Sequence, residues 1–162
     1  IMDKSTEELI KKRIIGIFPK LATDKNFKLT SPINPNYNCL AWACHYNDRW
    51  MQPPSITPPP LDSVVYWPED AKQGMEIECL IDAFRTKGYE LCDSWEYEDK
   101  YQKVALYVKK DSKTWTHAAR ELRNGFWTSK LGQGYDIQHG TPFTIEGDSY
   151  GEVYCIMKRI FQ

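Results

Sequence analysis

The stretch THAARELRNGFWTSK, residues 116–130, carries the clearest fold signal in this sequence. Two runs rich in strand-forming residues, 114–122 and 126–130, flank Asn124-Gly125, and this dipeptide is the strongest short signal for a β-hairpin. A two-residue turn at the dipeptide reverses the chain and pairs the two runs with each other. We therefore expect an antiparallel hairpin here.

Further strands are predicted on both sides of this hairpin. Val104, Leu106 and Val108 stand at every second position of the preceding run, which is the period of a β-strand. Residues 152–160 show the same alternation near the end of the chain. The C-terminal part of the sequence therefore predicts an antiparallel meander.

Three helices are predicted before the meander. Residues 5–15 open with Ser-Thr-Glu-Glu, which matches a capping box. A second helix begins near Asn38 or Cys39, because asparagine is a favoured N-cap residue. A third covers residues 75–86, with apolar side chains at helical spacing and Gly88 as its C-terminal cap.

Helices followed by an antiparallel meander indicate an α+β domain, with N-terminal helices packed on a C-terminal antiparallel sheet. The length of 162 residues predicts one domain, 1–162. Residues 5–35 supply the first helix and an irregular approach, and residues 36–162 form the core of the domain. Five prolines within residues 51–60 predict an extended surface loop inside this domain.

The composition excludes several classes of protein. The 21 basic and 22 acidic side chains nearly cancel, so nothing favours nucleic acid or an anionic membrane as a partner. No apolar run approaches the ~18 residues of a membrane span. The five cysteines form no CxxC pair, so neither a disulfide framework nor a metal site is expected, and no cofactor is implied. A reducing cytoplasm fits best, with leaderless delivery as the alternative.

Cys39 is the candidate nucleophile. The expected helix begins at this residue, and the positive end of a helix dipole favours the thiolate form of a cysteine. The competing interpretation is a small buried packing residue. The other four cysteines are expected to pack inside helices or strands.

His117 is the candidate general base, because it lies on an expected strand far downstream of the cysteine. If Arg123 pairs with Phe126, the loop from Gly132 to His139 emerges beside the His117 ring. Asp136 is then the first candidate to orient the imidazole, and His139 the second. A structural role for His117 is the alternative.

A reaction through a tetrahedral intermediate also requires hydrogen-bond donors for the oxyanion. The backbone N–H of Cys39 and the side chains of Asn38 and Gln133 are the candidates. Trp42 and Trp127 are candidate aromatic contacts for a ligand, and Trp50 and Trp67 are further ones.

Several strings in this chain resemble an uncharacterised bacterial domain family over about residues 36–159. They are NCLAWA at 38–43, YWP at 66–68, GYELC at 88–92, KVALY at 103–107, THAAR at 116–120, GFWTSKLG at 125–132 and DIQH at 136–139. The resemblance implies a shared fold and assigns no activity.

The chain is also distantly similar to papain-like and NlpC-type cysteine peptidases and amidases. In those enzymes a helix carries the catalytic cysteine and a later strand carries the histidine, and the matching positions here are Cys39 and His117. The Asp-Cys-Ser/Gly signature of the NlpC type is absent, and no asparagine follows His117 at the papain spacing. The similarity implies a papain-like fold and supports the cysteine–histidine pair.

The leading hypothesis is a cysteine-dependent hydrolase of amide bonds, that is, a peptidase or amidase acting on a peptide or protein. The alternative is a non-catalytic binding or interaction domain with tryptophans in its cleft and the proline loop as partner surface. A toxin or immunity-type module is a third hypothesis. The oligomeric state is left open.

Overall fold

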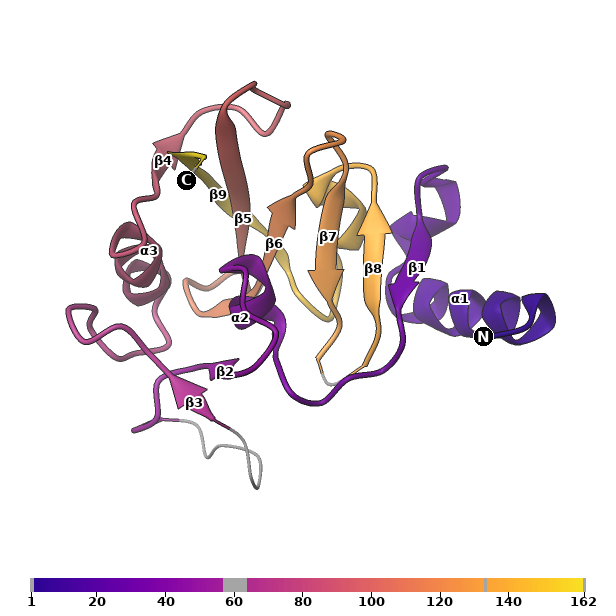
Figure 1. Cartoon of the computed structure of the whole chain (residues 1–162), viewed down its shortest axis with the longest axis horizontal. Coiled ribbons are helices and arrows are strands. Elements are labelled where there is room, and N and C mark those ends of the chain that lie inside the picture. Colours follow the sequence, from indigo (N-terminus) through magenta and orange to yellow (C-terminus); the bar gives the residue numbers. More distant parts are fainter. Residues whose placement is uncertain (1, 57–63, 133, 162) are drawn as a thin grey trace.

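The fold is organised around one antiparallel sheet (Figure 1). The computed structural model describes residues 2–56, 64–132 and 134–161. Within these residues the sheet has seven strands in the order β1-β8-β7-β6-β5-β9-β4, and all its pairings are antiparallel. The strands are β1 (Lys28–Ser31), β4 (Glu90–Cys92), β5 (Tyr101–Val108), β6 (Trp115–Glu121), β7 (Trp127–Lys130), β8 (Asp136–His139) and β9 (Glu152–Ile160).

The remaining elements are short. A separate parallel pair joins β2 (Trp50–Met51) to β3 (Val65–Tyr66). The helical elements are α1 (Lys4–Ile17), η1 (Pro19–Thr23), α2 (Cys39–Ala43), α3 (Ile77–Arg85) and η2 (Pro142–Ile145).

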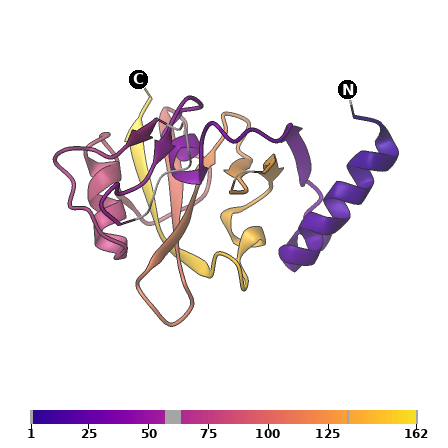
Figure 2. The ribbon, with the colours of Figure 1, turned by 90° about the horizontal axis from the view of Figure 1, so that it is seen from below.

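The expected papain-like or NlpC-type α+β arrangement is wrong. The antiparallel sheet dominates the described residues, and its helices are few and small. α1 runs away from the sheet rather than across it (Figures 1 and 2), and Ile14 is its one buried residue. β1, which precedes the predicted second helix, forms a sheet edge beside β8, so the sheet is not confined to the C-terminal part of the chain.

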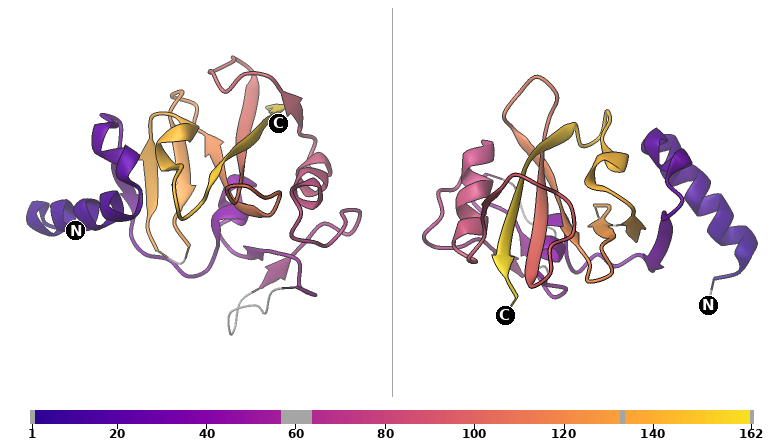
Figure 3. Two further views of the ribbon diagram at one scale, coloured as in Figure 1. Left: turned by 180° about the vertical axis from the view of Figure 1, so that it is seen from behind. Right: turned by 90° about the horizontal axis from the view of Figure 1, so that it is seen from above.

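Two layers of core side chains lie on the two faces of the sheet. Val104, Leu106 and Ala118 pack with α2 and α3, and this side is called the α2 face below. Tyr107 and Ala119 point the other way and pack with α1, η1 and η2, and this side is called the η2 face. The view from behind in Figure 3 shows η2 on the side opposite α2. The alternation of neighbouring residues along β5 and β6 thus decides which layer each side chain enters.

The central hairpin has a three-residue loop instead of the expected two-residue turn. Leu122 N donates to Phe126 O (2.7 Å), and Gly125 N donates to Leu122 O (3.0 Å). Gly125 has φ +86°, which a glycine adopts without strain. The pairing Arg120–Thr128 therefore replaces the expected register, which was wrong by one residue.

Most of the long elements are confirmed. The three predicted helices correspond to α1, α2 and α3, and the four predicted strands to β5, β6, β7 and β9. β8 was missed, because Asp136 and His139 were expected in a loop. Part of the proline-rich segment 51–60, residues 57–60, lies outside the described residues.

Candidate functional site

Asn38 and Cys39 start α2, as the sequence predicts. Asn38 Oδ1 accepts hydrogen bonds from the backbone N–H of Ala41 (3.1 Å) and Met51 (3.0 Å), and its Nδ2 donates to Met51 O (2.9 Å). The amide therefore caps the helix and ties it to β2, so its oxygen and one of its two N–H hydrogens serve the fold.

The expected lowering of the Cys39 pKa is wrong. The residue is half-buried, and desolvation of its sulfur raises the pKa of the thiol to about 11, although the backbone N–H groups of Ala118 and Leu40 and the charge of Lys130 oppose this. α2 has only five residues, so its dipole is small beside the cost of desolvating a thiolate. Cys39 is therefore a neutral thiol at pH 7.

The two predicted histidines belong to one buried hydrogen-bond chain on the η2 face. His117 Nε2 lies 3.0 Å from Ser129 Oγ, the same Oγ lies 2.8 Å from His139 Nε2, and His139 Nδ1 lies 2.8 Å from Thr141 O. A carbonyl only accepts, so His139 Nδ1 carries a proton and its Nε2 accepts from Ser129. Ser129 Oγ then accepts from His117 Nε2–H. Both imidazoles are therefore neutral.

Burial supports this protonation. His117 and His139 are both fully buried, and burial lowers the pKa of His139 to about 4 and that of His117 well below its ordinary value. The His117 ring also stacks on Tyr150, with centroids 3.9 Å apart. Its Nδ1, which carries the free lone pair, has no hydrogen-bond partner among the described residues.

The sheet separates the predicted nucleophile from the predicted base. Cys39 packs against the core of the α2 face, whereas His117 lies on the η2 face between Tyr107 and Tyr150. No hydrogen bond between Cys39 and His117 occurs in the described part of the chain. Of the predicted catalytic residues, the structure thus joins His117 and His139, through Ser129, and places Cys39 on the other face.

Asp136 also lies on the α2 face, away from both histidines. Its Oδ2 accepts hydrogen bonds from Ser31 Oγ and Tyr37 OH, both at 2.6 Å. Lys130, which is fully buried, donates to Gly134 O (2.6 Å), and its Nζ lies 5.0 Å from the centroid of the Tyr37 ring. Asp136 therefore anchors Tyr37 and β1 and does not orient His117. The other predicted donor, Gln133, lies outside the described residues.

The predicted aromatic contacts differ in their access to a ligand. Trp127 is fully buried in the core of the η2 face, and Trp67 is buried and stacks on Trp115. Trp42 is half-buried and donates from Nε1 to Thr128 Oγ1 (3.0 Å). Trp50 is half-buried as well. Trp42 and Trp50 thus keep an accessible edge, and Trp127 has none.

A group of cations and aromatic rings near α2 was missed by the sequence analysis. The Arg49 guanidinium lies 4.2 Å from the centroid of the Tyr46 ring, and Lys87 Nζ lies 4.6 Å from that of Tyr66. The two tyrosine rings contact each other edge to face at 5.6 Å. All four side chains are half-buried, and together they are called the cation–aromatic surface below.

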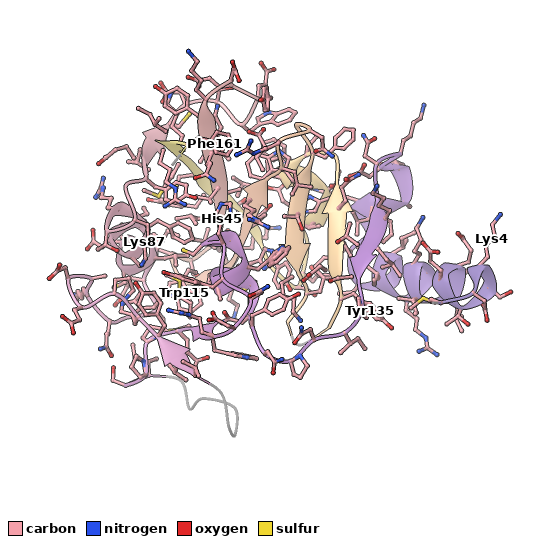
Figure 4. All side chains as sticks on the ribbon, in the orientation of Figure 1. Lys4, His45, Lys87, Trp115, Tyr135 and Phe161 are labelled. Atoms are coloured by element: carbon pink, nitrogen blue, oxygen red, sulfur yellow. The ribbon has the colours of Figure 1, made fainter. Side chains whose placement is uncertain are left out.

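Two arginines lie on the same face of the sheet. The Arg120 guanidinium stacks 4.4 Å from the centroid of Trp42, and that of Arg159 lies 4.6 Å from the centroid of Tyr89. Figure 4 shows His45 at the end of α2 in front of the sheet, with Lys87 on the side of α3. These residues come from α2, β3, β6 and β9 and from the segments that follow α2 and α3, so no single sequence window could indicate the group.

Two other site types find no support in the described residues. They contain no group of three or more histidine, cysteine or acidic side chains arranged to hold a metal ion. None of their helices is long and apolar enough to cross a membrane.

Comparison with known families then places the chain. A model of a domain of unknown function, DUF7689, matches residues 28–158. The chain belongs to the DUF7689 family. The matched range begins at β1 and leaves α1 outside the family domain. No curated protein and no solved structure matches the chain, and nothing links it to papain-like or NlpC-type peptidases.

Proposed function

We propose that this DUF7689 domain is a non-catalytic binding module that recognises an acidic peptide segment of a partner protein. The observation that carries the proposal is the cation–aromatic surface of Tyr46, Arg49, Tyr66 and Lys87. Cations held over aromatic rings present positive charge beside flat apolar area, which suits a chain of carboxylates with intervening side chains.

The charge of this surface is only partly compensated by the protein. Arg49 pairs with the neighbouring Asp48 (2.9 Å), but Lys87 has no carboxylate within salt-bridge distance among the described residues. Lys87 instead donates to Tyr46 OH (3.1 Å). A carboxylate of a partner would supply the missing counter-charge.

A peptide fits better than a nucleic acid. The formal net charge of the chain is −1, and binding of a nucleic acid rests mainly on many contacts between phosphates and basic side chains. A small surface with two cations matches a few carboxylates.

The proposal is tested with fluorescein-labelled ten-residue peptides, one rich in glutamate and one with glutamine at the same positions. We expect the glutamate peptide to bind at least tenfold more tightly in fluorescence anisotropy, and more weakly as salt rises. Lys87→Gln should reduce this binding. Lys20→Gln removes an equal charge within η1, where Lys20 pairs with Glu146, and should leave binding unchanged.

Equal binding of the two peptides would refute the proposal. Tighter binding of a labelled single-stranded oligonucleotide than of the glutamate peptide would refute it as well, and would assign the surface to nucleic acid.

Cysteine-dependent amide hydrolysis is a second candidate, favoured by one specific observation. A general base accepts a proton through a free lone pair, and His117 Nδ1 carries one. The thiol of Cys39 interacts with the backbone N–H of Ala118, the residue after His117. Catalysis would require a rearrangement that brings both groups to one side of the sheet. Hydrolysis of an activated ester, lost in both Cys39→Ala and His117→Ala, would support it. Equal rates in both variants would exclude it.

A further inference from the structure

An excess of hydrogen-bond donors surrounds His45, at the end of α2. His45 has φ +69°, a left-handed conformation that is strained for a residue with a Cβ atom. This conformation lets Tyr46 N donate to Ala41 O (2.8 Å) and so closes the helix. The imidazole reaches side chains of β5 and β6, and it remains exposed.

The protonation of His45 follows from its neighbours. Arg120 Nη1 donates to His45 Nδ1, and a guanidinium cannot accept, so Nδ1 carries the lone pair. The neutral ring therefore holds its proton on Nε2. Partial desolvation of the ring against β5 and β6, with the charges of Arg120 and Arg159, lowers the pKa of His45 to about 4, so the ring is neutral at pH 7 although the residue keeps an exposed edge.

This arrangement leaves two donors facing each other. His45 Nε2 lies 3.3 Å from Gln102 Nε2, and both atoms carry hydrogen. Rotating the Gln102 amide by about 180° would not remove this donor–donor contact without creating another, because its Oε1 already accepts from Arg159 Nε (2.7 Å). An acceptor atom is therefore missing between His45 and Gln102.

Two more buried polar atoms nearby have no partner among the described residues. They are Arg120 Nε and the hydroxyl of Tyr89, a residue whose side chain is fully buried. The charges of Arg120 and Arg159 both act on that hydroxyl. Neither arginine has a carboxylate within salt-bridge distance in the described part of the chain. Unpaired, partly buried guanidinium groups are costly unless an anion accompanies them.

We propose that His45, Gln102, Arg120 and Arg159 form a binding site for a single oxyanion, a carboxylate or phosphate group. The inference rests on the proposed function and deepens it, since the oxyanion would be the group through which an acidic peptide is anchored. One oxygen accepts from His45 Nε2–H and Gln102 Nε2. The two guanidinium groups supply the countercharge.

The site is tested on the full chain with sodium phosphate and sodium acetate at constant ionic strength. The readout is the NMR signal of the His45 ring, which His45→Gln identifies among only three histidines. We expect saturable shifts of this signal at pH 6.5, together with a rise in the thermal midpoint. The anion that binds more tightly then assigns the group as phosphoryl or carboxylate.

Arg120→Gln and Arg159→Gln should each weaken anion binding at least tenfold. Arg13→Gln removes the same charge from the exposed surface of α1 and should change it less than twofold. Thermal midpoints show whether each variant is folded, and Arg159→Gln alone suffices if Arg120→Gln is not. Absence of a saturable shift up to 50 mM (about 2 kcal/mol of standard binding free energy at that Kd) would overturn the proposal.

The two proposals fail in different ways. If phosphate or acetate binds at His45 but the glutamate peptide does not bind, the oxyanion site stands and the peptide module is refuted. If the peptide binds and both arginine variants retain full affinity for it and for the anions, the oxyanion site is refuted and the module stands.

Discussion

Lowering the pH should reduce the free energy of unfolding through the buried histidines. One buried glutamate opposes part of this reduction. His139 has a pKa of about 4 in the folded chain, against about 6.5 when unfolded. The unfolded chain therefore binds more protons between these values, so the contribution of His139 to stability is complete above pH 6.5 and is lost as pH falls toward 4. Between pH 7 and pH 5 this loss is about 2 kcal/mol. His117 acts in the same direction.

Glu121 opposes this change. Burial raises its pKa to about 7, and Oε2 has no partner among the described residues. A raised pKa means that the folded chain binds the proton more tightly, so this contribution is complete below about pH 4.5 and is lost as pH rises through 7. Acidification from pH 7 to pH 5 therefore returns about 2 kcal/mol of stability through Glu121.

The perturbation that separates the two effects is Glu121→Gln. Urea unfolding followed by tryptophan fluorescence should show a loss between pH 7 and pH 5 that is about 2 kcal/mol larger in this variant than in the wild type. As a second measurement, the His139 ring signal should not titrate above pH 5. Identical pH dependence of both proteins, or a His139 midpoint near 6.5, would refute the reasoning.

Three further changes test other parts of the structure. Ser129→Ala should cost about 1–3 kcal/mol of unfolding free energy, because both buried imidazoles lose a hydrogen-bond partner. A loss below about 0.5 kcal/mol would contradict the hydrogen bonds from Ser129 to His117 and His139, since such bonds usually contribute ~1 kcal/mol each. Gly151→Ala should prevent stable folding, since φ is +73° and a Cβ would lie 1.9 Å from Val108 O. The control Gly16→Ala on α1 places a Cβ where no atom lies within 4 Å, so it should leave stability unchanged or raise it. Similar thermal midpoints for the two variants would contradict this. Iodoacetamide at pH 7 should modify Cys92 on the edge strand β4 before Cys39, as peptide mapping would show, because burial keeps the Cys39 thiol protonated.

The sequence predicts the elements of this fold better than their arrangement. Alternation over 104–108 and the capping signals at Asn38 and Gly88 are local, so they identify β5, α2 and α3. β1 and β8 have four residues each, too few for a periodic pattern, and both lie in segments with turn-forming residues. Without β1 the sheet looks confined to the C-terminal part of the chain, which agrees with the papain-like arrangement that the similarity of Cys39 and His117 implied.

The candidate site shows a different limit. Cys39 and His117 have the chain order of a cysteine enzyme, yet chain order does not say which face of a sheet a side chain occupies. His117 shares its face with Ala119 by the ordinary alternation of a strand, and the β5–β6 register shifts only before it, which turns Trp115 to the α2 face. The pairing of Tyr107 with His117 places both rings in the core of the η2 face.

The oxyanion site could not be found from the sequence for a related reason. His45, Gln102, Arg120 and Arg159 belong to four segments that meet only when β9 and β6 flank β5 and α2 ends above them. Separately, each is an ordinary surface residue. They stand out because the hydrogen-bond donors around His45 outnumber the acceptors, and this excess can be recognised only when the register of the sheet is known. A free lone pair at His117 and a missing acceptor at His45 thus lie on opposite faces of one sheet, and the accessible, positively charged face is the one suited to binding.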